Sequence, residues 1–194
     1  MIAPVLEMPM DAETDERSLE ERYQQLSDRW PDHKVELIDD RIVVREVPTT
    51  DHADIIFRLV LQLIPLVTER GWKIWNDVAL FLGPQLGRYR PDILVVPPDP
   101  GLWGDDHVFG KDTLLVAEVV SKSSVHDDHE VKPRGCAQGK VPLYLVVDTF
   151  NGRVRLLSRP GEKGYDHEVE VKLGEPLELP APWSLTLDTS VLGR

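Results

Sequence analysis

Two acidic residues stand inside apolar stretches of the chain, and their placement needs a chemical explanation. Asp92 heads an apolar run in YRPDILVVPPDP, and Glu118 interrupts a second run in DTLLVAEVVSKSS. An ionised carboxylate in an apolar layer is so costly that it normally becomes neutral, forms an ion pair or binds a metal ion. Two carboxylates at equivalent places in adjacent strands would form an oxygen site suited to Mg²⁺ or Mn²⁺.

The alternation of side chains along a strand indicates where the Glu118 carboxylate points. Glu118 shares a face with Val116 and Val120, so its carboxylate should enter the layer that those valines occupy. The spacing alone leaves a second explanation open. A salt bridge to Arg88 or Arg90 at the strand entrance, or a capped helix N-terminus, accounts for the two carboxylates as well as a metal does.

The elements that would carry these residues follow from hydrophobic spacing. Helices are predicted over residues 14–30, capped by Thr14, and from residue 49 to about Gly71, with a kink or an end at Pro65. Two β-rich runs around Asp39 and Asp40 predict a hairpin between them. Further strands are predicted over residues 72–82, 92–98, 112–120, 141–148, 152–159 and 165–173, with a short helix near 126–139. This mixed order predicts an α/β or α+β fold with helices packed on a sheet.

Length and composition favour one globular domain. The chain has 194 residues, of which 41% are hydrophobic and 29% are charged. We expect a single domain over residues 1–194, with an N-terminal helix in 1–30, a core in 31–160 and a β extension in 161–194.

Charge and targeting signals narrow the class of protein. The net charge of −12 argues against a broad electrostatic contact with nucleic acid. No apolar stretch approaches the roughly 20 residues that span a bilayer, and the N-terminus lacks the pattern of a signal peptide. We therefore expect a cytoplasmic protein with no membrane partner. The single cysteine, Cys136, agrees with a reducing compartment and is expected to be a packed side chain.

Two histidines near the predicted short helix have the spacing of a zinc site. His126 and His129 are three apart and flank Asp127 and Asp128. Because no cysteine or third histidine lies at ligand spacing, we expect the two histidines to cap and solvate the start of the helix.

An ordered set of motifs gives the chain a resemblance to a known family. The series ELIDDRIVV, a helix beginning near His52, YRPDILVV, LLVAEVVSKSS and DDHEVKPRGCAQGKVPLYLVVD resembles the Uma-two family of small bacterial proteins. That family is part of the PD-(D/E)xK nuclease superfamily. The resemblance covers residues 35–157 and implies a restriction endonuclease-like fold, a mixed central β-sheet flanked by helices.

The resemblance also implies a role for each matching residue. Asp92 corresponds to the aspartate of the PD motif, Glu118 to the acidic residue of the (D/E)xK strand, and Lys132 to the active-site lysine. Glu36 corresponds to the family's early glutamate, a further metal ligand. His52 matches a histidine common in the family, although a polar residue near a helix start would explain it equally well. The implied protein is a Mg²⁺- or Mn²⁺-dependent endonuclease, with DNA as its partner and a homodimer as its assembly.

The chain departs from the superfamily pattern at the lysine. Val120 stands two positions after Glu118, where the usual lysine would be, so Lys132 must reach the site from another element. Lys122 is a rival, because it would share a face with Glu118 in an alternating strand. The segment KPRGCAQGKVP, which carries Lys132, places Pro133, Gly135 and Gly139 in the expected helix, and each glycine costs about 1 kcal/mol there relative to alanine. The aromatic residue usual in the family near Cys136 is missing, so the resemblance implies a loosely packed helix.

Three interpretations of function remain open. The first is a metal-dependent endonuclease that would contact DNA through metal ions or through a local basic strip formed by Lys122, Lys132, Arg134 and Lys140. The second is a nuclease-fold protein, impaired in catalysis, that acts as a binding or assembly module. The negative charge and the glycine-containing helix suggest it. The third is a metal-dependent hydrolase of another phosphate ester.

Overall fold

The structure is a computed structural model that describes the whole chain except residues 1–5, 8–17, 32, 46–47, 84–85 and 194. The helices are α1 (Leu19–Arg29), α2 (Thr50–Glu69) and α3 (Lys132–Gln138), with a π-helical turn η2 (Asp127–Val131) and short 3₁₀ helices η1 (Gly110–Asp112) and η3 (Thr189–Leu192). The strands are β1 (Leu6–Glu7), β2 (Lys34–Ile38), β3 (Arg41–Arg45), β4 (Lys73–Trp75), β5 (Ala79–Gly83), β6 (Gly87–Tyr89), β7 (Ile93–Val96), β8 (Leu102–Trp103), β9 (His107–Phe109), β10 (Leu115–Val119), β11 (Leu143–Asp148), β12 (Arg153–Pro160), β13 (Tyr165–Lys172), β14 (Pro176–Leu179) and β15 (Leu185–Asp188).

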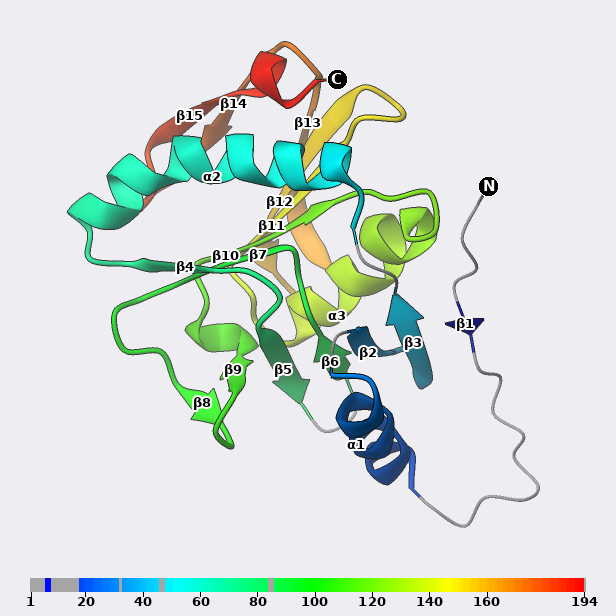
Figure 1. Cartoon of the computed structure of the whole chain (residues 1–194). Coiled ribbons are helices and arrows are strands. Elements are labelled where there is room, and N and C mark those ends of the chain that lie inside the picture. The colour runs from blue at the N-terminus through cyan, green and yellow to red at the C-terminus, as the bar shows by residue number, and fades with distance from the viewer. Residues whose placement is uncertain (1–5, 8–17, 32, 46–47, 84–85, 194) are drawn as a thin grey trace.

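Two mixed sheets form the centre of the molecule (Figure 1). The six-stranded sheet has the order β13-β12-β11-β10-β7-β4, in which β10 and β11 run parallel and the other neighbours run antiparallel. The seven-stranded sheet has the order β1-β3-β2-β6-β5-β9-β8, and β14 pairs with β15 as a separate hairpin. The mixed α+β fold with a central sheet and flanking helices is confirmed. Hydrophobic spacing did not predict that the strands divide between two large sheets.

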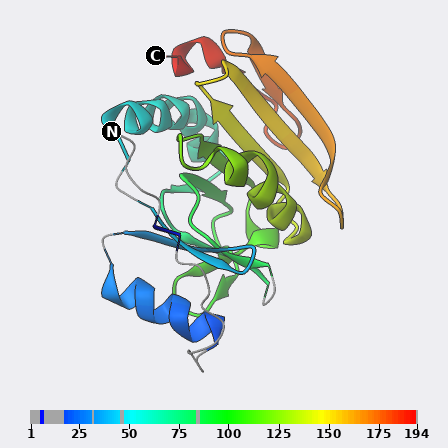
Figure 2. The same cartoon turned by 90° about the vertical axis from the view of Figure 1, so that its right-hand side faces the viewer.

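One face of the six-stranded sheet is covered by α2 and by the β14–β15 hairpin (Figures 1 and 2). The helix buries Ile55, Leu59, Leu63 and Val67 at helical spacing. These pack with alternate residues of β7, β10 and β11, namely Ile93, Val95, Leu115, Ala117, Val119, Leu143, Leu145 and Val147. We call this side of the sheet the α2 face. Its packing fixes the first turn of α2 beside the end of β10.

The opposite side of the same sheet, called the α3 face below, packs against α3 and the seven-stranded sheet (Figure 2). Its apolar cluster includes Val116 and Val120 of the β10 region and Leu94 and Val96 of β7. Glu118 lies between Val116 and Val120 on the same side of the strand, and its carboxylate contacts Lys132 of α3. The prediction that its carboxylate enters the layer of Val116 and Val120 is therefore confirmed.

Several predicted elements have different bounds in the structure. Residues 72–82 form β4 and β5 in different sheets, because the chain turns between them at Asp77, which has a φ of 54°. The first helix begins at Leu19 with Ser18 as its N-cap, and the predicted cap Thr14 lies outside the described residues. The second helix continues past Pro65, which is exposed, so water can satisfy the carbonyl left without a donor.

The predicted hairpin between the two helices is present as β2 and β3. Asp39 and Asp40 form its turn with φ values of 49° and 60°, a left-handed conformation that aspartate tolerates without glycine. Across the described ranges, no helix is both long and apolar enough to serve as a membrane span.

Candidate active site

Asp92 and Glu118 meet where the pairing of β7 with β10 ends. The last paired residues are Ile93 and Ala117. Beyond them, Glu118 Oε2 accepts a hydrogen bond from the Asp92 backbone N–H at 3.2 Å, and Asp92 Oδ2 accepts one from the Val119 N–H at 2.9 Å. Both acidic residues are buried, with exposed fractions of 7% and 2%. The two carboxylates are thus held side by side, each by the backbone of the other's strand.

Two basic side chains lie beside Asp92. Lys34, the first residue of β2, places Nζ 2.9 Å from Asp92 Oδ1 and 3.9 Å from Glu118 Oε2. His52, in the first turn of α2, places Nε2 3.2 Å from Asp92 Oδ2 and 2.8 Å from the carbonyl oxygen of Val119. The structure therefore brings His52 into the candidate site, whereas Lys34 was not predicted.

Lys132 approaches Glu118 from α3. Its Nζ lies 2.7 Å from Glu118 Oε1, 3.2 Å from Glu36 Oε1 and 3.2 Å from Asp128 Oδ1. The side chain is 1% exposed. Nζ donates a hydrogen bond to Glu118, and its contacts with Glu36 and Asp128 are ion pairs. The lysine implied by the resemblance is thus beside Glu118, but it lies among carboxylates rather than at the surface.

Glu36 extends the network away from Asp92. Its Oε1 accepts a hydrogen bond from the Arg90 backbone N–H at 2.9 Å, and its Oε2 accepts one from Arg45 Nε at 2.8 Å. Arg45 in turn donates to Asp127, which also pairs with Arg41. The role of Glu36 as a metal ligand stays a prediction.

The same surroundings affect the pKa values of the two carboxyls in opposite directions. Burial alone would raise the pKa of Asp92, but Lys34 and His52 outweigh burial and hold that pKa well below its usual range. Burial raises the pKa of Glu118 to about 8, although Lys132 and Lys34 act in the opposite direction. For His52, burial favours the neutral ring, but Asp92 outweighs it and raises the pKa of His52. Asp92, whose surroundings favour the ionised form, therefore lies beside Glu118, whose burial disfavours it.

The helix that carries Lys132 is tightly packed, so the expected loosening is wrong. Cys136 is fully buried, as the sequence predicted. Gly135 faces the hydroxyl of Tyr89 so closely that a Cβ would overlap it, and a Cβ on Gly139 would lie 2.6 Å from Leu82 Cδ2. The glycines cost helix propensity but allow this close contact between α3 and the seven-stranded sheet.

The Asp92 and Glu118 carboxylates both form ion pairs in the structure, but with lysines rather than with the arginines that the sequence suggested. The Arg88 side chain pairs with Glu20, and Arg90 reaches Glu36 only through its backbone, so neither side chain neutralises Asp92. Lys122 is exposed in the turn after β10. Of the predicted basic strip, Lys122, Arg134 and Lys140 are exposed, whereas Lys132 is buried.

The expected capping by the two histidines near α3 is wrong: His126 is the N-cap residue of η2, but its side chain makes no cap hydrogen bond, and His129 lies within the turn. His126 is exposed, but His129 is buried, and its Nε2 lies 2.8 Å from Asp148 Oδ2. Its Nδ1 lies 2.7 Å from Arg155 Nη1, so Nδ1 accepts and Nε2 donates. The expectation of solvation was wrong for His129, because its partner Asp148 is distant in the sequence.

A hard divalent cation fits the donors around Asp92. Asp92 and Glu118 offer carboxylate oxygens, and Val119 offers a carbonyl oxygen next to them. Mg²⁺ and Mn²⁺ prefer such ligands. The ammonium of Lys34 already lies against both carboxylates, so a positive charge is accommodated there. Among the described residues no group of three His, Cys, Asp or Glu side chains has metal-binding geometry, so backbone and water oxygens would complete the ligand set.

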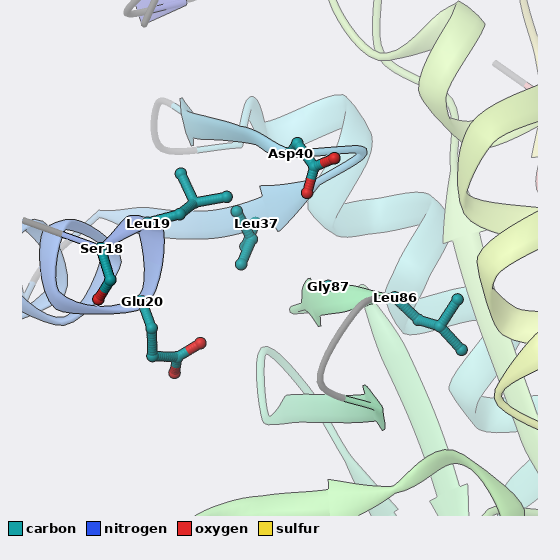
Figure 3. A pocket seen from close by; sticks show the side chains of 7 residues that line it. All are labelled: Ser18, Leu19, Glu20, Leu37, Asp40, Leu86 and Gly87. Atoms are coloured by element: carbon teal, nitrogen blue, oxygen red, sulfur yellow. The ribbon is translucent and has the colours of Figure 1, made fainter. Parts of the chain in front are cut away.

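A hollow of about 250 Å³ lies apart from this network, at the start of α1 (Figure 3). Its lining comes from α1, the β2–β3 hairpin and β6, and consists of Ser18, Leu19, Glu20, Leu37, Asp40, Leu86 and Gly87. None of these residues was predicted for the site. The candidate site is therefore a buried carboxylate network rather than this hollow.

Comparison with known proteins finds a matching family model, a related sequence and a solved structure of similar fold. The model of the Uma2 (Uma-two) family, described as "Putative restriction endonuclease", matches residues 20–190. Uncharacterized protein sll1609 of Synechocystis sp. is 26% identical over 134 residues, which are 67% of this chain and 75% of that protein. A crystal structure described as a "putative nuclease belonging to DUF820" from Anabaena variabilis has a TM-score of 0.62 at 15% identity, over 81% of this chain and 88% of that one. This last likeness shows a shared fold.

Proposed function

Because the chain belongs to the Uma2 family of restriction endonuclease-like proteins, we propose that it is a divalent-metal-dependent endonuclease that hydrolyses DNA phosphodiester bonds. One observation carries the proposal. Asp92 and Glu118, which hydrophobic spacing alone marked as a pair, lie side by side at the end of β7 and β10 with a lysine ammonium against both. Paired carboxylates with a nearby lysine suit metal-assisted phosphoryl chemistry.

Each residue of the network has a proposed role. A bound Mg²⁺ or Mn²⁺ would supply the charge that activates water and neutralises the phosphoryl oxygens. Asp92, Glu118 and the Val119 carbonyl would hold that ion, and His52 would orient Asp92 and Val119. Lys132 would fix the position of Glu118, because ion pairs with Glu36 and Asp128 hold its ammonium in place.

DNA must approach a protein of net charge −12. A local excess of positive charge near the site can offset this repulsion, and bound metal ions add to it. We propose that Arg41, whose side chain is 38% exposed, and the exposed Lys122 and Arg134 contribute to phosphate contacts. The homodimer and the cytoplasmic location remain predictions.

Nicking of supercoiled plasmid at low salt, with Mg²⁺ or Mn²⁺, tests the proposed activity. We expect the wild-type protein to nick the plasmid only with metal, and Asp92→Ala to lose at least about a thousandfold in rate, since it removes a metal ligand. Asp105→Asn, which neutralises an exposed carboxylate in a loop, should cleave like the wild type.

The same experiment separates the other interpretations. Metal-dependent stabilisation without cleavage would favour the impaired binding module and contradict the endonuclease. The loosely packed helix that suggested impairment is absent, since the Lys132 helix is buried. Hydrolysis of a small phosphodiester with no action on plasmid would favour the hydrolase of another phosphate ester.

A further inference from the structure

Lys34 lies where the two proposed metal ligands converge. Its Nζ is 2.9 Å from Asp92 Oδ1 and 3.9 Å from Glu118 Oε2. The ammonium is therefore the counter-ion of the pair in the metal-free protein. Without it, Asp92 would keep only His52 and the Val119 N–H, and Glu118 would keep Lys132 and the Asp92 N–H. The two buried carboxyl groups would then face each other across two strand ends with no cation between them.

A divalent ion and the Lys34 ammonium compete for the same oxygens. Oxygen ligands surround Mg²⁺ at about 2.1 Å, so an ion bound by Asp92 and Glu118 would lie within a few ångströms of an ammonium still bound to Asp92. Two such cations repel strongly inside a protein. Either the ion binds weakly or the ammonium leaves.

The structure contains an acceptor for a departing ammonium. Asp77, in the turn between β4 and β5, places Oδ1 3.8 Å from Lys34 Nζ, and its side chain is 54% exposed. The Lys34 side chain is itself 15% exposed. A change of rotamer would thus move the ammonium from Asp92 towards Asp77 and solvent, without any change in the backbone.

Lys132 has no comparable freedom. It is 1% exposed and contacts three carboxylates, all of them nearly or fully buried. Lys132 is therefore held in one position in the interior, whereas Lys34 can move between Asp92 and Asp77.

We propose that Lys34 is a tethered counter-ion that occupies the place of the metal between Asp92 and Glu118 and is displaced towards Asp77 when a divalent ion binds. The inference rests on the proposed metal site. It has two consequences. Lys34 keeps the metal-free site intact and weakens its affinity for metal, and metal binding brings a positive charge to the mouth of the site.

Amine labelling of the wild-type protein tests the displacement directly. The full chain is treated with an acylating reagent with and without Mn²⁺, and the modification of each lysine is measured by mass spectrometry. We expect labelling of Lys34 to rise severalfold with Mn²⁺, while the exposed Lys163 and the buried Lys132 are unchanged. Unchanged labelling of Lys34 at saturating Mn²⁺ would overturn the inference.

Metal titration of two variants tests the competition. Lys34→Met removes the charge but keeps the length of the side chain, and we expect Mn²⁺ to bind at least about tenfold more tightly in calorimetry. Lys34→Arg keeps a cation and should bind Mn²⁺ no more tightly than the wild type. Equal affinity in Lys34→Met and wild type would overturn the inference while leaving the proposed function standing. No Mn²⁺ binding by any of the three proteins would overturn both.

Discussion

The two faces of the six-stranded sheet both pack apolar side chains, but only the α3 face adds the buried charged network around Glu118, although the same strands supply both faces. On the α2 face, successive strands contribute Val95, Ala117 and Leu145 to an apolar cluster. On the α3 face, the neighbouring position of β10 is Glu118, which joins buried basic and acidic groups from β2, η2 and α3. Each residue of the α2 face contributes through area removed from water. The α3 face has an apolar cluster of its own and, beside it, a network of buried charged groups that includes Glu118 and Lys132.

This difference separates stability from function. Apolar side chains of similar volume could replace buried ion pairs at no loss of stability, because the cost of removing charges from water offsets much of their attraction. A network that surrounds Asp92 and Glu118 with cations is therefore poor evidence for a role in folding. Groups with strongly shifted pKa values gather at functional sites, and this face contains both Asp92 and Glu118.

The largest effect on stability should come from removing the central cation of the α3 face. Lys132→Met leaves Glu36, Glu118 and Asp128 without their shared ammonium, and we expect the free energy of unfolding to fall by about 3 to 5 kcal/mol. Urea denaturation at neutral pH measures it. Lys163→Met, at an exposed position, is the matched control. A loss under about 1 kcal/mol would contradict a balanced buried network.

Substitutions on the α2 face should change the free energy of unfolding only through the buried apolar surface that they remove. Leu59 is fully buried in its cluster, and Leu59→Ala should lower the free energy of unfolding by about 2 to 4 kcal/mol through lost burial and a cavity. Leu61→Ala, on the same helix but 50% exposed, should change it by less than about 0.5 kcal/mol. We expect Mn²⁺ binding to raise the melting temperature of the wild type, and both variants should show the same rise. Loss of this rise in Leu59→Ala would mean that the two faces are not independent.

A substitution at the contact between α3 and the seven-stranded sheet should change stability by less, and in the opposite direction from the same substitution in an exposed helix. Replacing an exposed glycine inside a helix by alanine raises the free energy of unfolding by about 1 kcal/mol. Gly135→Ala should instead destabilise the protein by about 1 to 3 kcal/mol, because the new methyl overlaps the Tyr89 hydroxyl. In a Tyr89→Phe background the loss should shrink, and thermal unfolding of the four proteins measures the coupling. Equal losses in both backgrounds would contradict this contact.

The smallest effect concerns Asp148, at the edge of the α3 face. Burial alone would raise the pKa of Asp148, but hydrogen bonds from Asn151 and His129 outweigh it and lower that pKa. Its contribution is therefore present above the unfolded pKa of about 4 and is lost as the pH falls through the folded pKa. Asp148→Asn should cost about 1 to 2 kcal/mol at pH 7, and the difference from wild type should narrow below about pH 4. If the difference in free energy of unfolding between Asp148→Asn and wild type does not change with pH, the charge of Asp148 does not contribute to stability.

The sequence predicted those parts of the site that leave a local signal. Asp92 and Glu118 interrupt apolar runs, and alternation along β10 placed the Glu118 carboxylate on the correct face. The contact of Lys132 with Glu118 could be inferred only from the resemblance, because the lysine reaches its partner from a different element.

The rest of the network depends on which strands become neighbours. Lys34 looks like an ordinary polar residue at the start of a strand, and its place beside Asp92 requires β2 to lie in the second sheet opposite the end of β7. Arg45 and Asp127 are 82 residues apart, and only the fold joins them. The glycines of α3 were misread for the same reason, since Tyr89 comes from another strand.

Glu118→Gln offers the most direct test of the claim that the α3 face is a site for metal-dependent cleavage rather than a structural network. The amide keeps the shape of the side chain, and its one oxygen can still accept from Lys132 as Glu118 Oε1 does, whereas its NH2 group replaces the Oε2 that accepts from the Asp92 N–H. Plasmid nicking with Mn²⁺ and urea denaturation are measured on the same preparation. The account predicts that nicking falls at least about a hundredfold in protein that is still folded, with the free energy of unfolding lowered by only about 1 to 3 kcal/mol for the buried N–H left without an acceptor. Nicking at the wild-type rate, or a loss only in proportion to unfolding, would contradict it.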